Sequence, residues 1–371
     1  MHIAVPKETK VHEYRVGMTP ESVAELVEDG HRVTVETGAG GGINASDADY
    51  RDAGAEIVDG PEAVFAAADM IVKVKEPSAA ERAMLRDGQI LFTYLHLAPD
   101  PEQTKDLVAS GAVCIAYETV TDDDGGLPLL KPMSQVAGRM AIQVGAHCLE
   151  KEPGGRGILL GGVPGVMPGK VVVIGGGVVG FNAAQMAVGL GADTTVLDRN
   201  AAVLEEVANH FEARIRTRFS SRSNLADSVR TADLVIGAVL VAGAKTPKLI
   251  SRAMLSEMKP GAVLVDVAVD QGGCFETSRP TSHAEPTFVV DGIVHYCVAN
   301  MPGAVPRTST YALNNVTLPH ISRIAQHGWK EACRRDPHLA NGLNVMGGKV
   351  IHPAVAEALG YTLRDLETAL S

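Results

Sequence analysis

The sequence predicts an α/β protein built from two doubly wound domains with parallel sheets, and three observations support this fold class. Short apolar runs rich in Val and Ile alternate with helical stretches along most of the chain, as strands joined by helical crossovers do. One of these strands runs into a glycine-rich turn and a helix, which is typical of a dinucleotide-binding sheet. A chain of 371 residues also exceeds what one hydrophobic core usually holds, so two domains are expected.

The first domain begins with a strand at residues 2–5, closed by Pro6 and followed by the charged loop 7–17. Thr19 and Pro20 then open a helix, because a hydroxyl suits the cap and proline suits the first turn. Further strands are expected at 31–36, 70–75, 90–96 and 114–118. Helical stretches such as 61–69 and 101–111 separate them, so this sheet is predicted to be parallel.

The second domain is organised around the strand 171–174 and the glycines that follow it. Gly175, Gly177 and Gly180 have G-x-G-x-x-G spacing, and a helix of small residues starts at about Phe181. The first glycine permits the tight turn, the second lets a pyrophosphate approach the backbone, and the third lets helix and strand pack closely. The helix N-terminus then offers free N–H groups to the phosphates.

A second strand, 193–198, ends in Asp198, which stands 18 positions after Gly180. A carboxylate at this place can accept hydrogen bonds from the adenosine ribose and would repel a 2′-phosphate. The pattern therefore favours NAD over NADP. The structural alternative is a glycine-rich turn beside a surface aspartate.

The turn-rich segments 122–128 and 301–306 mark the expected domain boundaries. Between them a helix is expected from Ser134, its cap, to about residue 151. Including the two strands already described, six strands complete the sheet, the others being 214–219, 234–239, 262–266 and 293–298. The tail has too few strands for a domain, so it is expected to return to the first one. The predicted domains are residues 1–128 with 307–371, and residues 129–306.

Composition excludes some classes of partner and compartment. A net charge of −11 argues against a nucleic-acid partner. Five scattered cysteines without C-x-x-C spacing predict free core thiols in a reducing compartment. The first residues are expected to form a strand instead of a signal peptide, and no apolar run approaches 18 residues. We therefore expect a cytoplasmic protein without a membrane segment.

Four ionisable residues follow strands of the two predicted sheets, at the edges where ligands collect in doubly wound folds. Lys75 and His96 come at the ends of two strands of the first domain, and Arg15 lies in the loop after its first strand. Asp270 follows the strand 262–266, before a pair of glycines. Each has a structural alternative: an edge lysine, a core histidine, a surface arginine and a turn aspartate. Lys75 and His96, at equivalent strand ends, are expected to face one cleft. The Arg15 guanidinium suits a substrate carboxylate, and Asp270 is expected on the side where the nicotinamide lies.

Eight blocks of the chain, in order, resemble the alanine dehydrogenase family, which includes the NAD-binding subunit of proton-translocating transhydrogenase. They are VPKETKVHEYRVGMTP, IVKVKEP, ILFTYLHLAPD, LLKPMSQVAGRMA, GGVPGVMPGKVVVIGGGVVG, LVIGAVLVAGAKTPKL, LVDVAVDQGGCFE and YCVANMPGAVPRTST. The resemblance implies two Rossmann-like domains with an interdomain cleft, and a homohexamer.

The resemblance also implies roles for individual residues. Arg15 would hold the substrate carboxylate, Lys75 would polarise the reacting centre, His96 would be the general acid/base, and Asp270 a second acid/base or orienting carboxylate. Tyr94 and Asn300 would complete the substrate site. The NAD-binding residues would be Ser134, Gly175, Gly177, Val178, Val179, Gly180, Asp198, Ser220, Val239, Leu240, Val267, Ala268, Val269, Asp270, Arg279, Val298, Ala299, Asn300 and Met301.

The implied reaction is the reversible, NAD-dependent oxidative deamination of L-alanine to pyruvate and ammonia. The alternatives are the NAD-binding subunit of a transhydrogenase-type complex, a catalytically silent homologue, and a dehydrogenase for a related amino acid. Some relatives hold magnesium with an acid one turn before a histidine on the C-terminal helix. Here Arg323 and His327 form that pair, and a cation cannot replace a carboxylate ligand, so no metal is expected.

Overall fold

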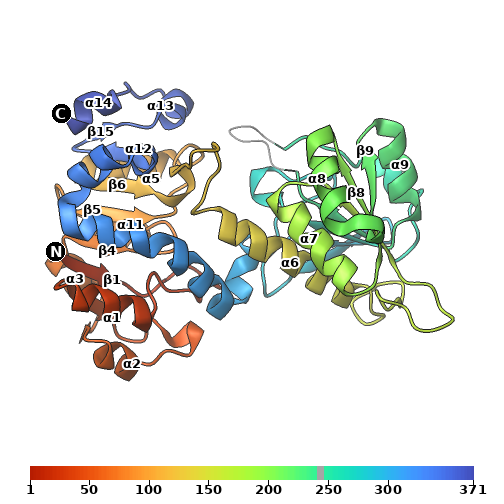
Figure 1. Cartoon of the computed structure of the whole chain (residues 1–371), viewed down its shortest axis with the longest axis horizontal. Coiled ribbons are helices and arrows are strands. Elements are labelled where there is room, and N and C mark those ends of the chain that lie inside the picture. Colours follow the sequence, from red (N-terminus) through yellow and green to blue (C-terminus); the bar gives the residue numbers. More distant parts are fainter. Residues whose placement is uncertain (240–245) are drawn as a thin grey trace. The chain divides into compact units, whose positions relative to one another are not determined.

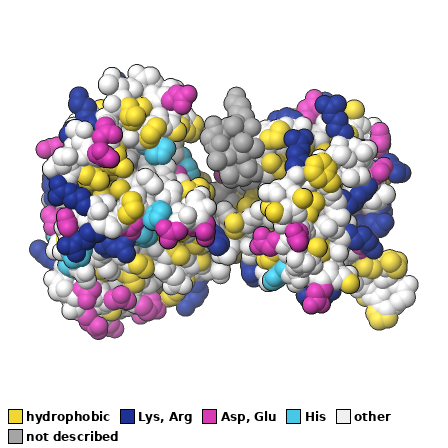
Figure 2. Space-filling view, turned by 45° about the horizontal axis from the view of Figure 1, so that its top comes forward, with side chains coloured by type: hydrophobic (Ala, Val, Ile, Leu, Met, Phe, Trp, Pro, Cys, Tyr) yellow, Lys and Arg dark blue, Asp and Glu magenta, His cyan; other side chains and the backbone are white. Residues whose placement is uncertain are grey.

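The computed structural model describes residues 1–239 and 246–371 and divides them into two compact units. The first unit combines Met1–Met133 with Gly303–Ser371, and the second is Ser134–Pro302 (Figure 1). The sequence placed these limits at 128/129 and 306/307. On the face drawn in Figure 2, acidic and basic side chains are interspersed over both units. Among the helices of the described part, none has both the length and the hydropathy needed to cross a membrane.

The first unit is built on an eight-stranded sheet in the order β15-β14-β6-β5-β4-β1-β2-β3. Its strands are β1 (His2–Val5), β2 (Arg32–Glu36), β3 (Glu56–Val58), β4 (Met70–Val72), β5 (Ile90–Thr93), β6 (Val113–Ala116), β14 (Leu343–Met346) and β15 (Lys349–Val350). β1 to β6 are parallel, whereas β14 pairs antiparallel with β6 and with β15. The returning segment therefore extends the first sheet.

Helices connect and cover these strands. They are α1 (Pro20–Glu28), α2 (Asp47–Asp52), α3 (Pro61–Ala67), α4 (Ala79–Met84), α5 (Pro101–Ser110), α11 (Pro306–Arg335), α12 (Pro337–Ala340), α13 (Pro353–Leu359) and α14 (Leu366–Leu370). Thr19 caps α1 as expected, since its side chain accepts a hydrogen bond from the N–H of Ser22. Gly328, with a φ of 74°, interrupts α11.

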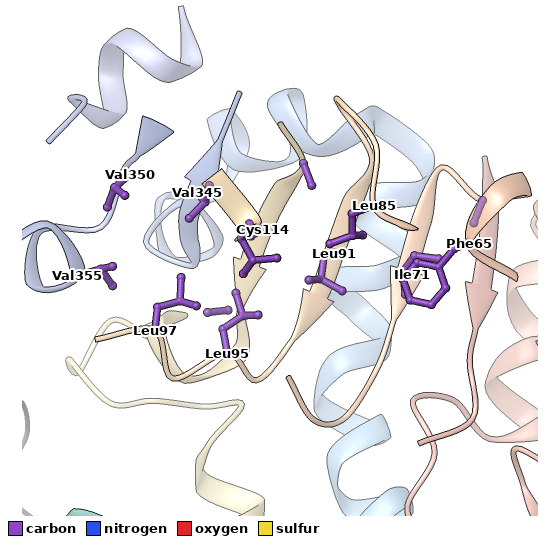
Figure 3. Packing of buried hydrophobic residues seen from close by; sticks show 14 of the residues in the cluster. Phe65, Ile71, Leu85, Leu91, Leu95, Leu97, Cys114, Val345, Val350 and Val355 are labelled. Atoms are coloured by element: carbon purple, nitrogen blue, oxygen red, sulfur yellow. The ribbon is translucent and has the colours of Figure 1, made fainter. Parts of the chain in front are cut away.

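One row of side chains crosses the first sheet and forms the centre of its core (Figure 3). The strand registers align Ile71, Leu91, Cys114 and Val345 side by side, and each is fully buried. Side chains of α3, α5 and α13 pack on this row, including Phe65, Leu107 and Val355. Packed on this face, the sheet provides a rigid base for the loops at its edge.

The second unit contains a seven-stranded sheet in the order β12-β13-β11-β10-β7-β8-β9. The strands are β7 (Lys170–Ile174), β8 (Asp193–Asp198), β9 (Arg216–Phe219), β10 (Leu234–Gly237), β11 (Val263–Asp266), β12 (Thr287–Val290) and β13 (Ile293–Tyr296). The helices are α6 (Lys131–Cys148), which begins in the first unit, α7 (Val178–Gly189), α8 (Ala201–Phe211), α9 (Arg222–Thr231) and α10 (Arg252–Leu255). All six expected strands are present, and the seventh, β12, adds an antiparallel edge.

Short single-turn 3₁₀ helices complete both units, namely η1 (Gly41–Ile43), η2 (Tyr117–Thr119), η3 (Glu212–Arg214), η4 (Val269–Gln271) and η5 (Met301–Ala304). The glycines at 38–42 are part of a tightly packed turn. A Cβ on Gly42 would lie 2.0 Å from the carbonyl oxygen of Tyr14, and one on Gly40 would lie 2.6 Å from the Tyr50 ring. Close packing therefore accounts for two of these glycines.

Candidate functional site

Three of the expected site residues of the first unit lie at one edge of its sheet. β1, β4 and β5 are adjacent and parallel, so their carboxyl ends share that edge. Arg15 lies in the loop after β1, Lys75 lies three residues after the end of β4, and His96 lies three residues after the end of β5. We call this the first-sheet edge. The structure brings these residues to one edge because the three parallel strands that precede them all end there.

Arg15 is buried and held by a neighbouring carboxylate. Its Nε and Nη2 donate to Oε1 and Oε2 of Glu13 at 2.7 and 2.6 Å, and its Nη1 lies 3.1 Å from the sulfur of Met133. Burial opposes the charge, but the Glu13 carboxylate raises the pKa of Arg15 above its ordinary value. Arg15 is therefore a rigid, permanently charged group, as recognition of a carboxylate requires.

Lys75 is a half-buried cation without a fixed counter-ion. In the described residues, its ammonium takes part in no ion pair and no hydrogen bond. Burial lowers the pKa of Lys75, and the positive charges of Arg15 and Lys10 lower it further, while Glu76 and Glu13 oppose them. An anionic ligand at this edge would supply the missing counter-charge.

His96 has a left-handed backbone, with a φ of 51°, which is uncommon for a residue other than glycine. A carboxylate holds it there, because the N–H of His96 donates to Oε1 of Glu118 at 2.6 Å and the N–H of Leu95 donates to Oε2 at 3.2 Å. The imidazole Nδ1 is 3.9 Å from the same Oε1. About half of the His96 side chain is exposed, so a ligand can reach the ring.

Tyr94 is buried beneath this histidine. Its ring stacks on the His96 imidazole, with the centroids 5.9 Å apart, and its hydroxyl donates to the carbonyl oxygen of Leu129 at 2.6 Å. Burial raises the pKa of Tyr94 well above its ordinary value, so the hydroxyl stays protonated. The structure thus gives Tyr94 a supporting contact with His96, and its contact with substrate stays a prediction.

The glycines of the second unit form a cradle at the end of β7. Gly175 has a φ of 100°, and a Cβ on Gly180 would lie only 1.7 Å from the carbonyl oxygen of Gly175. A Cβ on Gly177, in contrast, would meet no atom within 4 Å. The open space at Gly177 and the N-terminus of α7, which begins at Val178, fit the pyrophosphate of a dinucleotide.

Asp198 lies beside this cradle, at the end of β8. Its Oδ2 accepts a hydrogen bond from the N–H of Gly176 at 2.7 Å, and its Oδ1 accepts one from Asn200 at 2.8 Å. The carboxylate is half-buried and adjacent to the phosphate cradle. This is the position from which an acid can bind ribose hydroxyls.

The other expected cofactor residues follow the neighbouring strands at the same edge. Ser220 follows β9, Val239 follows β10, residues 267–269 follow β11, and residues 298–301 follow β13. Arg279 lies over the ring of Phe288 on the edge strand β12, with its Cζ 4.2 Å from the centroid. Leu240 lies outside the described residues.

Ser134 was expected to cap its helix, and that expectation is wrong. α6 begins at Lys131, so Ser134 lies within its first turns. Ser134 nevertheless stands one turn before Gly138, on the same face of α6. A Cβ on Gly138 would lie 2.2 Å from the carbonyl oxygen of Val179, so this face of α6 packs on the first turn of α7. Ser134 is therefore a helical residue one turn away from this contact, and its role in binding the cofactor stays a prediction.

Asp270 is exposed on η4, and a buried carboxylate organises its loop. Asp266 accepts hydrogen bonds from the N–H groups of Ala268 at 3.1 Å and Cys274 at 2.8 Å, and from the hydroxyl of Ser278. Burial raises the pKa of Asp266, and these donors oppose that shift. Asp266 thus fixes both ends of the loop that carries Asp270.

Sequence reasoning missed the acids that hold these residues, namely Glu8, Glu13, Glu118 and Asp266, and the buried Lys73. Glu8 and Glu13 stand in a loop whose density of charge suggested exposure to solvent. Two sequence signals could have identified these acids: a carboxylate within a few positions of an expected catalytic cation, or a carboxylate that follows the end of a strand. The residue type alone does not separate a buried acid from an exposed one.

The C-terminal helix does not offer the acid-and-histidine pair of a magnesium site. Arg323 of α11 forms an ion pair with Asp336, and the Nε2 of His327 lies 3.5 Å from Arg335. In the described residues, no three His, Cys, Asp or Glu side chains gather as a metal site requires.

A glycine-rich turn before α7 in one doubly wound unit and a cationic strand edge in the other are typical of an α/β protein with a nucleotide-binding fold. Comparison with known proteins refines this class. The model of the alanine dehydrogenase/PNT N-terminal domain matches residues 4–137, and that of the alanine dehydrogenase/PNT C-terminal domain matches residues 141–353. The chain therefore belongs to the alanine dehydrogenase/PNT family, and the family and fold class expected from the sequence are confirmed.

Individual relatives are similar to this chain over its full length or nearly so. An alanine dehydrogenase of Halomonas elongata is 61% identical over 97% of each chain, and one of Mycobacterium tuberculosis is 54% identical over 100% of each. A solved structure of an L-alanine dehydrogenase superposes with a TM-score of 0.94 at 50% identity and covers 100% of each chain. The structure of a transhydrogenase from Sinorhizobium meliloti is more distant, at 26% identity and a TM-score of 0.82, covering 95% of this chain and 100% of its own.

Proposed function

We propose that this chain catalyses the reversible oxidative deamination of L-alanine to pyruvate and ammonia, with NAD as cofactor. The observation that carries this proposal is the 61% identity, over 97% of both chains, with a protein named alanine dehydrogenase. The transhydrogenase alternative has less support, since the solved transhydrogenase is only 26% identical.

The two cations of the first-sheet edge have different tasks. Arg15, already paired with Glu13, supplies directed hydrogen bonds to the substrate carboxylate. Lys75 supplies a positive charge that forms no ion pair with a carboxylate of the described residues, and so stabilises the oxyanion that develops when pyruvate is attacked. A preorganised charge of this kind commonly contributes a few kcal/mol to the transition state.

His96 is the group that moves protons. In the oxidative direction, loss of hydride from the α-carbon gives an iminium, water adds to give a carbinolamine, and its collapse releases ammonia. His96 removes the proton of the attacking water and returns a proton to the leaving amine, a role that an accessible imidazole can fill near neutral pH. Asp270 acts as a second acid/base or orients the reacting groups from its exposed turn.

NAD bound at the glycine cradle of the second unit would be the hydride acceptor. Its pyrophosphate would lie against Gly175, Gly177 and Gly180. Asp198 would accept hydrogen bonds from its ribose, and the negative charge of Asp198 disfavours a 2′-phosphate. Asn300 completes the substrate site, and the remaining cofactor residues are those that follow the strand ends.

We also propose a cytoplasmic homohexamer that needs no metal. Five free, buried cysteines suit a reducing compartment. Exposed apolar side chains on the loop between α6 and β7 suit self-association, namely Leu159, Val163, Val166 and Met167. The ion pair of Arg323 with Asp336 opposes a magnesium site. A chelator should therefore leave turnover unchanged, and analytical ultracentrifugation should give the mass of six chains.

The test is the oxidation of NADH, followed by its absorbance, with pyruvate and ammonium together and with each omitted. Oxidation that requires both substrates, and that is faster with NADH than with NADPH, would establish reductive amination and support Asp198 as the residue that selects NAD. If NADH binds tightly but no small keto acid is turned over, the enzyme proposal fails and the transhydrogenase-type binding role takes its place.

A further inference from the structure

Glu8 stands just beyond β1 and is buried, although it carries a charge and lies in a polar loop. Its Oε1 accepts hydrogen bonds from the backbone N–H groups of Val74 at 2.7 Å and Lys75 at 3.3 Å. Its Oε2 lies 3.3 Å from the ammonium of Lys73. One carboxylate thus contacts three consecutive residues, the last of which is the unpaired cation of the first-sheet edge.

Residues 73–75 follow the end of β4 at Val72, and beside them Glu8 takes the position that β1 occupies beside β4. β1 pairs with β4 only as far as Ala4 and Ile71. On the other side, contacts with β5 and with Tyr94, the residue after it, continue. The N–H of Lys73 donates to the carbonyl oxygen of Phe92 at 3.2 Å, the N–H of Tyr94 donates to that of Val74 at 3.4 Å, and the Thr93 hydroxyl donates to that of Lys75 at 3.0 Å. On the β1 side, the Glu8 carboxylate takes the place of a backbone carbonyl.

Lys73 is the buried counter-ion of this arrangement. Its ammonium donates to Oε1 of Glu81 at 2.8 Å as well as to Glu8. Burial alone would lower the pKa of Lys73, but the two carboxylates raise it above its ordinary value. Burial raises the pKa of Glu8, which Lys73 and the Val74 N–H oppose. Lys73 therefore stays charged and secures the carboxylate in place.

We propose that Glu8 is a positioning residue for Lys75: its carboxylate fixes the backbone at Val74 and Lys75, so that the Lys75 ammonium is held at the first-sheet edge for the substrate. This inference rests on the proposed function only in assigning Lys75 to the substrate. The Glu8 carboxylate pairs with the Lys73 ammonium and also accepts a hydrogen bond from the N–H of Lys75. Substitution of Glu8 is therefore expected to affect substrate binding as well as folding.

Glu81 provides the matched control. Like Glu8, it is buried and paired with Lys73, but its other oxygen accepts the N–H of Ser78 at the cap of α4, and no hydrogen bond within the described part of the chain joins it to Val74 or Lys75. Glu8→Ala and Glu81→Ala each remove one carboxylate beside Lys73, but only Glu8→Ala also removes the acceptor of the Val74 and Lys75 N–H groups. A purely structural role for Glu8 predicts that the two variants behave alike.

The experiment compares the full-length wild type with Glu8→Ala and Glu81→Ala in steady-state kinetics with pyruvate, at saturating NADH and ammonium. We expect Glu8→Ala to raise the KM for pyruvate about tenfold or more, and Glu81→Ala to change it by less than about twofold. The Kd for NADH should stay at its wild-type value in both. Equal changes in KM in the two variants, or no change in Glu8→Ala, would overturn the proposal.

Amide hydrogen exchange gives a second readout that needs no turnover. Exchange at Val74 and Lys75 should be faster in Glu8→Ala than in Glu81→Ala, and pyruvate should slow it in the wild type. Equal exchange in both variants would refute the positioning role. A wild type that does not oxidise NADH with pyruvate and ammonium would refute the proposed function instead, and exchange would still decide whether Glu8 holds this segment.

Discussion

Alanine at position 180 is expected to weaken both folding and cofactor binding. The added Cβ would lie 1.7 Å from the carbonyl oxygen of Gly175, whereas an ordinary contact needs about 3.4 Å. α7 and the turn after β7 must therefore separate by roughly 1.7 Å. Overpacking of this kind costs about 1–3 kcal/mol, and the better helix propensity of alanine returns up to about 1 kcal/mol.

The same separation disturbs the cradle, because Gly175 and α7 form its two walls. A misplacement of about 1 Å in a binding site can cost up to roughly a hundredfold, so we expect the Kd for NADH to rise about tenfold to a hundredfold. The measurements are a fluorescence titration with NADH and a thermal unfolding midpoint.

Substitutions at two other glycines of this region distinguish an effect on folding from an effect on cofactor binding. A Cβ on Gly177 would meet no protein atom within 4 Å, so Gly177→Ala should keep its unfolding midpoint while NADH binding weakens. Gly189, at the other end of α7, also has free space, and Gly189→Ala should change neither quantity for the worse. Wild-type NADH affinity and stability in Gly180→Ala would refute this account of the cradle.

Three further predictions concern other parts of the chain. His96→Ala should lower turnover about a hundredfold or more with an unchanged Kd for NADH, and unchanged turnover would make His96 a structural residue. Burial lowers the pKa values of His295, His320 and His352 in the folded protein. The contribution of these neutral histidines to stability is therefore present above pH 6.5 and is lost as the pH falls from 6.5 through their lower pKa values in the folded state. The thermal unfolding midpoint should accordingly be lower at pH 5 than at pH 7. Iodoacetamide should label none of the five cysteines in the native protein and all of them in the unfolded protein, because burial raises the pKa of each thiol to about 11 or 12. Rapid labelling of the native protein would contradict this prediction for the cysteines concerned, which are Cys114, Cys148, Cys274, Cys297 and Cys333.

The parallel strands could be predicted because they are buried on both faces and rich in β-branched residues. The expected strand 70–75 nevertheless continued too far, since Lys73 and Lys75 maintain the alternation after the hydrogen-bonded ladder ends at Val72. The edge strands β3 and β12 were missed because they are short and only partly buried. Their pairing depends on neighbours distant in sequence, which local patterns do not report.

The candidate site was predicted as far as strand ends and glycine spacing allow. Arg15, Lys75 and His96 follow from the rule that parallel strands present their carboxyl ends together. Glu8 was not foreseen, because its contacts with Val74 and Lys75 cross 66 and 67 positions of sequence. Ser134 was assigned as the cap of an amphipathic helix, whereas α6 begins three residues earlier, at Lys131.

The division of the chain has a consequence for its biosynthesis. The second unit is one continuous segment, whereas the first sheet needs β14 to cover β6, and more than two hundred residues separate these two strands. While the ribosome is still producing Ser134–Pro302, β6 presents an unpaired edge, which is the kind of surface that recruits other chains into aggregates. Completion of the first unit must therefore wait for the last part of translation, and premature termination before Leu343 would release a protein with an open sheet.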